Sequence, residues 1–114
     1  MNEASQPPLE IEPQEVQAWL DTDRAFLLLD CREPEEHATV HLREAKLLPM
    51  SQLTSRQAEL EPHRDTAIVV HCHHGGRSLQ VVEWLRQQGF VNAQSMAGGI
   101  DRWALEIDPA LPRY

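Results

Sequence analysis

Two continuous apolar runs constrain the fold of this chain more than any other feature. Residues 25–30 (AFLLLD) and 67–71 (AIVVH) each have the length of a strand. The first run shows no alternation of polar and apolar residues, which is typical of a strand buried on both faces in a parallel sheet. Helices must then cover both faces of that sheet, so the chain predicts an α/β fold.

The segments around these runs alternate in the way that such a fold requires. Shorter strands are expected at residues 9–11, 45–48 and 91–96, and helices at residues 13–20, 33–38, 51–60, 78–88 and 100–105. Pro13 suits the first turn of its helix, Ser51 can cap another, and Gly89 can end the helix before it. Together they predict a small doubly wound domain, with a mainly parallel five-stranded sheet and helices on both faces.

The length of 114 residues leaves room for one domain. We expect a flexible N-terminal leader at residues 1–8, the domain at 9–106, and a C-terminal tail at 107–114 outside the packed body. No apolar stretch approaches the ~20 residues that cross a bilayer, and the N-terminus lacks the basic and apolar regions of a signal peptide. Two cysteines in such a chain favour free thiols and a cytoplasmic location.

The charge balance excludes several kinds of partner. Ten basic residues against 18 acidic ones give a net charge of −8, which argues against nucleic acid and anionic membranes as partners. The same charge disfavours long-range attraction of an anionic substrate. Any anion site must therefore be local, made from backbone N–H groups, Arg77 and the neighbouring imidazoles.

Residues 71–78 (HCHHGGRS) place a cysteine between a strand and a helix. Free N–H groups and the positive end of a helix dipole favour an anion at such a position, and the same field lowers the pKa of a thiol. Gly75 and Gly76 allow the backbone to bend so that several N–H groups point at one spot. The pattern predicts that Cys72 is a reactive thiolate.

This loop and three further segments resemble the rhodanese domain of thiosulfate sulfurtransferases, in its single-domain form. Residues 72–78 are similar to the family's active-site loop, and 28–36 (LLDCREPEE) to its strand-ending Asp-x-Arg segment. Residues 38–45, which include His41, resemble the stretch that leads into the third strand, and 98–103 (GGIDRW) the C-terminal signature. The resemblance extends over residues 9–106 and implies a rhodanese-like fold.

The resemblance also implies a mechanism. The thiolate of Cys72 would take sulfane sulfur from thiosulfate or a persulfide donor and pass it to cyanide or a thiol, a covalent transfer in two displacements. No cofactor and no metal are implied, and a sulfur-accepting protein is a further candidate partner. The substrate-binding residues would be those of the loop: His73, His74, Gly75, Gly76, Arg77 and Ser78. Asp30 and Arg32, near the end of their strand, are expected to support the loop.

Two other functions stay open at this stage. A sulfur-relay or regulatory module that acts on a partner protein is compatible with a chain that has little surface to enclose a substrate. Phosphatases and arsenate reductases of the same fold separate their cysteine and arginine by five residues, whereas four separate Cys72 from Arg77. The shorter loop favours sulfur transfer.

Several side chains in and near the loop have a second interpretation. Arg77 could contact the substrate or pair with Asp30 or Glu33 to hold the loop closed, and the two roles can coexist. Ser78 is expected chiefly to cap its helix. Cys31 could act as a resolving thiol if its strand neighbours that of Cys72. A buried cysteine also fits the aliphatic position that the family commonly has there, and we favour that interpretation.

The histidines and one loop complete the expectations. Successive side chains point in different directions, so residues 71–74 are a poor metal site. We expect His73 and His74 to line the pocket mouth, where partial protonation adds positive charge. His71 should pack at the strand end, and the remaining histidines, His37, His41 and His63, should lie at the surface or in turns. The family's glycine and proline-glycine pair are replaced by Val40, Arg43 and Glu44, so the turn at Val40 should take another geometry.

Overall fold

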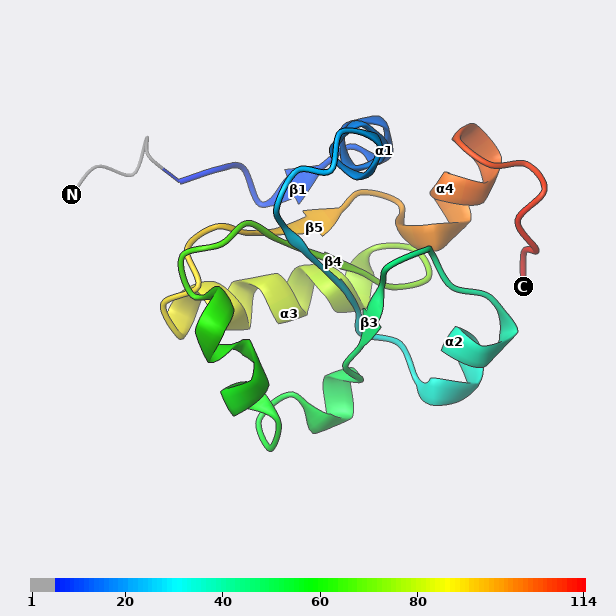
Figure 1. Ribbon diagram of the computed structural model, residues 1–114. Coiled ribbons are helices and arrows are strands. Elements are labelled where there is room, and N and C mark those ends of the chain that lie inside the picture. Colours follow the sequence, from blue (N-terminus) through cyan, green and yellow to red (C-terminus); the bar gives the residue numbers. More distant parts are fainter. Residues whose placement is uncertain (1–5) are drawn as a thin grey trace.

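A fully parallel five-stranded sheet runs through the middle of the molecule (Figure 1). The computed structural model describes residues 6–114. The strand order is β1-β5-β4-β2-β3, and every neighbouring pair is parallel. The strands are β1 (Glu10–Ile11), β2 (Leu27–Asp30), β3 (Lys46–Leu47), β4 (Ile68–His71) and β5 (Ala93–Met96). The predicted α/β sheet is confirmed.

Helices cover both faces of the sheet, as predicted. α1 (Pro13–Asp21) and α4 (Gly99–Glu106) lie on one face, and α3 (Gly76–Gln87) lies on the other (Figure 1). Successive residues of β4 point to opposite faces. Ile68 and Val70 therefore pack in the core beneath α3, whereas Val69 packs in the core beneath α1 and α4. Three consecutive apolar residues, 68–70, form this central strand because both of its faces are covered.

The expected helix at residues 51–60 is wrong. Two 3₁₀ segments, η2 (Met50–Gln52) and η3 (Gln57–His63), take its place. The Ser55 hydroxyl donates to the Gln52 carbonyl at 3.1 Å, a local bond that competes with helical hydrogen bonds. Pro62 lies inside η3 and has no N–H group to donate. Burial of two leucines, Leu53 and Leu60, holds this irregular segment on the core.

Backbone conformation decides two local features, the start of α3 and the turn in the 38–45 loop. α3 begins at Gly76 rather than Ser78, because Gly75 takes a left-handed conformation (φ 108°) and caps the helix. In the 38–45 loop, Val40 is extended (φ −161°), and the positive φ (64°) falls on Glu44. The expectation that Val40 avoids the left-handed turn is confirmed.

Both predicted end segments make contacts with the domain. Residues 107–114 were expected to lie outside the packed body, but the partly buried Leu111 packs against the core beneath α1 and α4, and Arg113 pairs with Asp101 at 2.8 Å. At the other end, the carbonyl oxygens of Pro7 and Pro8 accept from the guanidinium of Arg86 at 2.7 and 3.0 Å. The rest of the expected flexible leader, residues 1–5, lies outside the described residues. The two terminal segments contact residues that lie elsewhere in the sequence, so no local pattern predicts these contacts.

Candidate active site around Cys72

Hydrogen-bond donors converge on the sulfur of Cys72, directly beyond the end of β4. The side chain is 1% exposed. Its Sγ accepts the backbone N–H of Gly75 at 3.1 Å and that of Ser78 at 3.4 Å, and it lies 3.4 Å from the Ser78 hydroxyl. These contacts form the kind of local anion site that the sequence predicts.

The start of α3 supplies this cradle. Gly75 reaches its φ of 108° without strain because it has no Cβ, and any Cβ there would approach the Gly98 nitrogen to 3.3 Å. The first turn of α3 contains no acidic residue. The positive end of the helix is therefore not neutralised by a side chain of its own and favours negative charge on the Cys72 sulfur.

Cys31 is buried in the core beneath α3, as the favoured interpretation predicts, and it also lies beside Cys72. It follows β2, the neighbour of β4, and its N–H donates to the His71 carbonyl at 3.1 Å. The neighbouring Cys31 thiol lowers the pKa of Cys72 well below the ordinary value. The donors from Ser78 and Gly75 act in the same direction against the cost of burial. The proximity of Cys72, together with burial, raises the pKa of Cys31, and the two shifts favour a thiolate on Cys72 beside a thiol on Cys31.

α4 holds the loop from the opposite side. The first-turn N–H groups of Ile100 and Asp101 donate to the carbonyls of Cys72 and His73 at 2.9 and 3.0 Å. Gly99 permits this approach, because a Cβ there would come within 2.5 Å of the Cys72 carbonyl oxygen. Since these two loop carbonyls are engaged on α4, they do not compete for the donors that face the sulfur.

Arg77 anchors the loop to α2 (Pro34–Thr39). Its Nη1 and Nη2 donate to the two carboxylate oxygens of Glu36 at 2.9 and 3.0 Å. The expected partners, Asp30 and Glu33, are therefore wrong. The bidentate pair with Arg77 lowers the pKa of Glu36 to about 2, although partial burial opposes the shift. No sequence signal distinguished Glu36 from the adjacent acids, because the contact joins residues 41 positions apart.

Asp30 and Arg32 form a buried ion pair, and both side chains are 0% exposed. Arg32 donates from Nε and Nη2 to the two oxygens of Asp30 at 2.8 and 2.6 Å, and from Nη2 to the Val40 carbonyl at 2.6 Å. Burial by itself would raise the pKa of Asp30. The hydrogen bond from Arg32, together with His71 and His37, lowers it to about 2. Because the charges are paired and hydrogen-bonded, burial is tolerated.

These two residues contact the rest of the site through the C-terminal segment. Arg32 Nη1 donates to the Tyr114 hydroxyl, which in turn donates to Glu36, both at 2.8 Å. The Tyr114 ring stacks on His73 with centroids 4.0 Å apart. Tyr114 is a site residue that sequence reasoning missed, and His37, expected at the surface or in a turn, bonds to Asp30 at 2.7 Å. Asp30 and Arg32 are thus connected to the loop indirectly, through Tyr114 and its contacts with Glu36 and His73.

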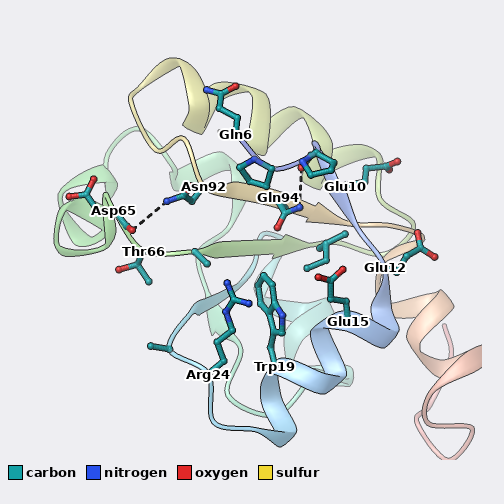
Figure 2. A pocket seen from close by; sticks show the side chains of 15 residues that line it. Gln6, Glu10, Glu12, Glu15, Trp19, Arg24, Asp65, Thr66, Asn92 and Gln94 are labelled. Atoms are coloured by element: carbon teal, nitrogen blue, oxygen red, sulfur yellow. Dashed lines mark hydrogen bonds between the residues drawn. The ribbon is translucent and has the colours of Figure 1, made fainter. Parts of the chain in front are cut away.

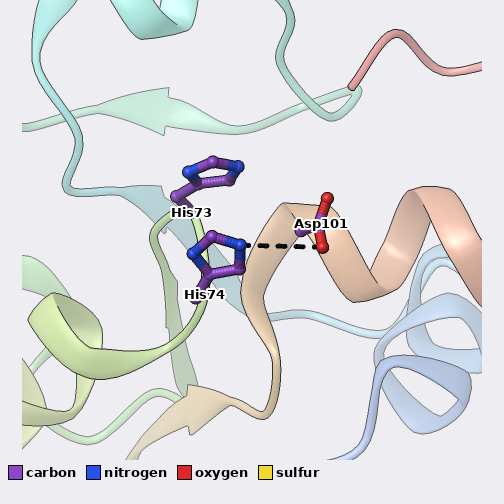
Figure 3. A group of neighbouring side chains, drawn as sticks. All are labelled: His73, His74 and Asp101. Atoms are coloured by element: carbon purple, nitrogen blue, oxygen red, sulfur yellow. Dashed lines mark ion pairs between the residues drawn. The ribbon is translucent and has the colours of Figure 1, made fainter. Parts of the chain in front are cut away.

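His73 and His74 lie at the outer side of the loop. The His73 ring is stacked between Tyr114 and His74, with 3.9 Å between the centroids of the two histidines. Burial, and then the neighbouring His74, lower the pKa of His73. It therefore carries less positive charge near neutral pH than the sequence analysis expected. The His74 side chain is 68% exposed, and its Nε2 lies 3.6 Å from an Asp101 oxygen (Figure 3).

Among residues 6–114, one group offers three potential metal ligands close together. His73, His74 and Asp101 each present one ligand atom, and these atoms all lie within 4.8 Å of one another (Figure 3). The Asp101 carboxylate already pairs with Arg113 at 2.8 Å. An ion here would have to compete with this guanidinium, so the group shows no arrangement dedicated to a metal.

A groove also lies at the opposite ends of the strands, away from Cys72 (Figure 2). It encloses about 990 Å³, and its lining includes Ala67 and Asn92, which directly precede β4 and β5. Four carboxylate side chains line it: Glu10, Glu12, Glu15 and Asp65. Its one lining cation, Arg24, lies over the Trp19 ring at 3.9 Å. Ligands of open α/β sheets bind beyond the carboxyl ends of the strands, which is the edge that carries Cys72.

Comparisons with known proteins give a family match and several sulfurtransferase relatives. Residues 12–106 match the family described as the Rhodanese-like domain. The chain is 34% identical over 104 residues to the probable adenylyltransferase/sulfurtransferase MoeZ of Mycobacterium tuberculosis, covering 91% of this chain and 26% of that protein. It is 35% identical over 95 residues to a sulfurtransferase of Allochromatium vinosum, covering 83% of this chain and 87% of that protein.

The fold is also shared with solved structures. A thiosulfate sulfurtransferase from Pseudomonas aeruginosa superimposes with a TM-score of 0.80 at 28% identity, over 97% of this chain and 21% of that one. The chain therefore spans about a fifth of that protein and about a quarter of MoeZ. The likeness concerns one domain of these larger proteins.

Proposed function

This chain belongs to the rhodanese-like domain family, and we propose that it transfers sulfane sulfur as a persulfide on Cys72. The observation that carries the proposal is the convergence of the backbone N–H groups of Gly75 and Ser78 on the buried sulfur of Cys72. The sulfurtransferase relatives support sulfur transfer as the general activity. Thiosulfate, or a small persulfide, is the donor that we propose.

The proposed reaction consists of two displacements at sulfur. The Cys72 thiolate attacks the outer sulfur of thiosulfate, the S–S bond of thiosulfate breaks, and sulfite leaves with the bonding electrons. The resulting persulfide anion is one sulfur longer and stays within reach of the N–H donors of the loop. Cyanide or a thiolate then attacks the terminal sulfur and releases Cys72 as thiolate. The low pKa of Cys72 makes it a good leaving group in this second step.

No general acid or base is required in this scheme. Sulfite and the Cys72 thiolate both leave as stable anions, so neither step needs a proton from the protein. The donors of the loop instead stabilise negative charge at fixed positions, in a site that is largely closed to water. Covalent catalysis of this kind divides one difficult transfer into two easier ones.

The phosphatase and arsenate reductase alternatives are less well supported. An arginine binds an oxyanion through its terminal guanidinium nitrogens, and in Arg77 both of these nitrogens donate to Glu36. The loop also has four residues between Cys72 and Arg77, rather than the five expected for those enzymes. These features favour a persulfide on Cys72 over a phosphorylated or arsenylated cysteine.

The alternative acceptor is a protein thiol. MoeZ, which this chain matches over a quarter of its length, is described as both an adenylyltransferase and a sulfurtransferase. A relay role would place the sulfur of Cys72 on a partner rather than on cyanide or a small thiol.

Among residues 6–114, no helix is long and apolar enough to cross a membrane. The cytoplasmic location stays a prediction from the sequence.

Intact-mass measurement after incubation with thiosulfate tests the proposal. The wild type is expected to gain ~32 Da, one sulfur atom, and to lose it to cyanide as thiocyanate. Cys72→Ser is the matched variant and should gain nothing. If the wild type gains no mass from thiosulfate or from a small-thiol persulfide, the proposal fails. Hydrolysis of an aryl phosphate by the wild type would favour the phosphatase alternative instead.

A further inference from the structure

The two cysteines of the chain occupy neighbouring positions on adjacent strands. β2 and β4 are paired in parallel with Asp30 opposite His71, so the next residues, Cys31 and Cys72, lie side by side. Both side chains point into the core beneath α3. Adjacent strands run roughly 4.8 Å apart, which is within the Cα separation that disulfides span, ~4.4–6.8 Å. The two sulfurs can therefore be joined without a large movement of the backbone.

Burial separates this pair from thiols in solution. Each cysteine is 1% exposed, and both are free. An external thiol must enter past the loop to reach the persulfide, whereas Cys31 already contacts the nucleophile. Fixed proximity of this kind raises the effective concentration of a reacting group far above that of a dissolved competitor.

We propose that Cys31 is a resolving thiol that displaces hydrosulfide from the Cys72 persulfide and closes a Cys31–Cys72 disulfide. The inference rests on the proposed persulfide chemistry of Cys72. It adds a second outcome to the same site. Sulfur is transferred when an acceptor is present and is released as hydrosulfide when none is.

The step balances without an external oxidant. The Cys31 sulfur attacks the inner sulfur of the persulfide, a Cys31–Cys72 S–S bond forms, and the bond between the inner and outer sulfurs breaks. The outer sulfur leaves with the bonding electrons and takes the proton of the Cys31 thiol, so that HS⁻ departs. The sulfane sulfur is reduced to sulfide, and the two cysteines are oxidised to a disulfide. Return to the resting state requires a dithiol reductant.

The charge on Cys72 accounts for when the step occurs. In the resting site, the adjacent Cys72 and burial raise the pKa of Cys31, so its thiol keeps its proton. In the persulfide, the negative charge lies one sulfur farther out, while the N–H groups of Gly75 and Ser78 face the inner sulfur. The inner sulfur is then electrophilic, and the proton of Cys31 can pass to the outer sulfur as it leaves.

A single-turnover experiment on the whole chain tests this inference. The protein is loaded with thiosulfate, freed of excess donor, and kept anaerobic without an acceptor, so that oxygen cannot form the disulfide. Intact mass and hydrosulfide are followed together. In the wild type, the species at ~+32 Da should convert to one at ~−2 Da with about one equivalent of hydrosulfide, and dithiothreitol should restore the original mass. Proteolysis without reduction should recover the Cys31 and Cys72 peptides joined.

Two variants make the result specific to Cys31. Cys31→Ser and Cys31→Ala should each hold the added ~32 Da and release less than about a tenth of the hydrosulfide that the wild type releases. Two substitutions of different polarity are used because one of them could disturb packing at this buried position. A wild type that keeps its added sulfur, or that forms disulfides only between two chains, overturns the inference and leaves the proposed function intact. If the wild type and both Cys31 variants show neither the ~+32 Da species nor the ~−2 Da species, the result instead counts against the proposed function.

Discussion

The N-termini of α3 and α4 begin alike but are used differently. Each helix follows a strand and starts at a glycine pair, Gly75-Gly76 or Gly98-Gly99. The first glycine of each pair is left-handed, with φ of 108° and 75°. The N–H groups at α3 face the sulfur of Cys72, whereas those of α4 donate to the carbonyls of the loop that carries this cysteine.

The two helices also differ in charge. α4 has an acidic residue in its first turn, Asp101, which also pairs with Arg113. The first turn of α3 contains no acidic residue. The positive end of α4 is therefore faced by a carboxylate of its own first turn, whereas the positive end of α3 is faced by the Cys72 sulfur. A helix N-terminus becomes a site only when its donors and its field are not already used within the fold.

Adding a methyl group to α4 should have the largest effect. In Gly99→Ala, the new Cβ would lie 2.5 Å from the Cys72 carbonyl oxygen, at a residue whose φ is 62°. We expect a loss of about 3 kcal/mol in the free energy of unfolding, from overpacking and strain together. Loading from thiosulfate should also fall, since the loop must move. Urea unfolding and intact-mass loading measure the two effects.

Gly76→Ala is the matched control for this change, because no atom lies within 4 Å of its new Cβ. Its free energy of unfolding should change by less than about 1 kcal/mol. If Gly99→Ala is as stable as Gly76→Ala, the close packing of α4 on the loop does not hold the site.

Removing one donor at α3 tests the use of this helix as an anion site. In Ser78→Ala, the Cys72 sulfur loses the hydroxyl that lies 3.4 Å away, while the backbone N–H remains. The pKa of Cys72 should rise by about one unit, so alkylation below that pKa should slow about tenfold. The pH dependence of iodoacetamide alkylation measures the shift. Ser95→Ala, which removes a hydroxyl 2.7 Å from Ser78 Oγ, should shift the profile less. Identical profiles in all three proteins would contradict the assignment.

Glu36→Gln tests the anchor between the first turn of α3 and α2. The pKa of Glu36 in the folded protein is about 2, against an ordinary value of 4.5. A lowered pKa contributes stability that is present above about pH 4.5 and is lost as the pH falls toward about 2. The variant should lose about 1 kcal/mol at neutral pH, since the pair with Arg77 is only partly screened by solvent. Its unfolding free energy should also lack the acid-dependent part.

Urea unfolding between pH 7 and pH 2 measures this dependence, and Glu35→Gln serves as the control. Glu35 is exposed in the same first turn of α2. A pH profile of Glu36→Gln that parallels the wild type would show that the pair with Arg77 does not anchor the loop.

Asp101→Asn should have the smallest effect of the four changes. The substitution removes the carboxylate that lies at the start of α4 and pairs with Arg113 and, at 3.6 Å, faces His74. A small fall in Tm is expected at low salt and should largely disappear at about 1 M NaCl, where exposed charges are screened. Thermal unfolding at the two salt concentrations measures it. A fall that is equally large in high salt would assign the effect to packing rather than to charge.

Local sequence patterns were sufficient for the parts of the molecule that depend on nearby residues. The apolar run at 67–70 predicted a strand that ends at His71, and the glycines after Cys72 predicted a bend with converging N–H groups. Residues 51–60 show the limit of the same reasoning. Their apolar spacing suggested a helix, but hydroxyl side chains and Pro62 offered local alternatives that only packing could resolve.

The sequence by itself determined the sheet, the position of the loop that carries Cys72 and the family, because each depends on residue order over a few neighbours. The tertiary structure alone decided what each charged or reactive side chain touches. It paired Arg77 with Glu36 across 41 positions and Arg32 with Tyr114 across 82. It also placed Cys31 against Cys72, because β2 and β4 are neighbours in the sheet although they are distant in the chain. Contacts of this kind arise from the register of packed elements, which no local pattern encodes.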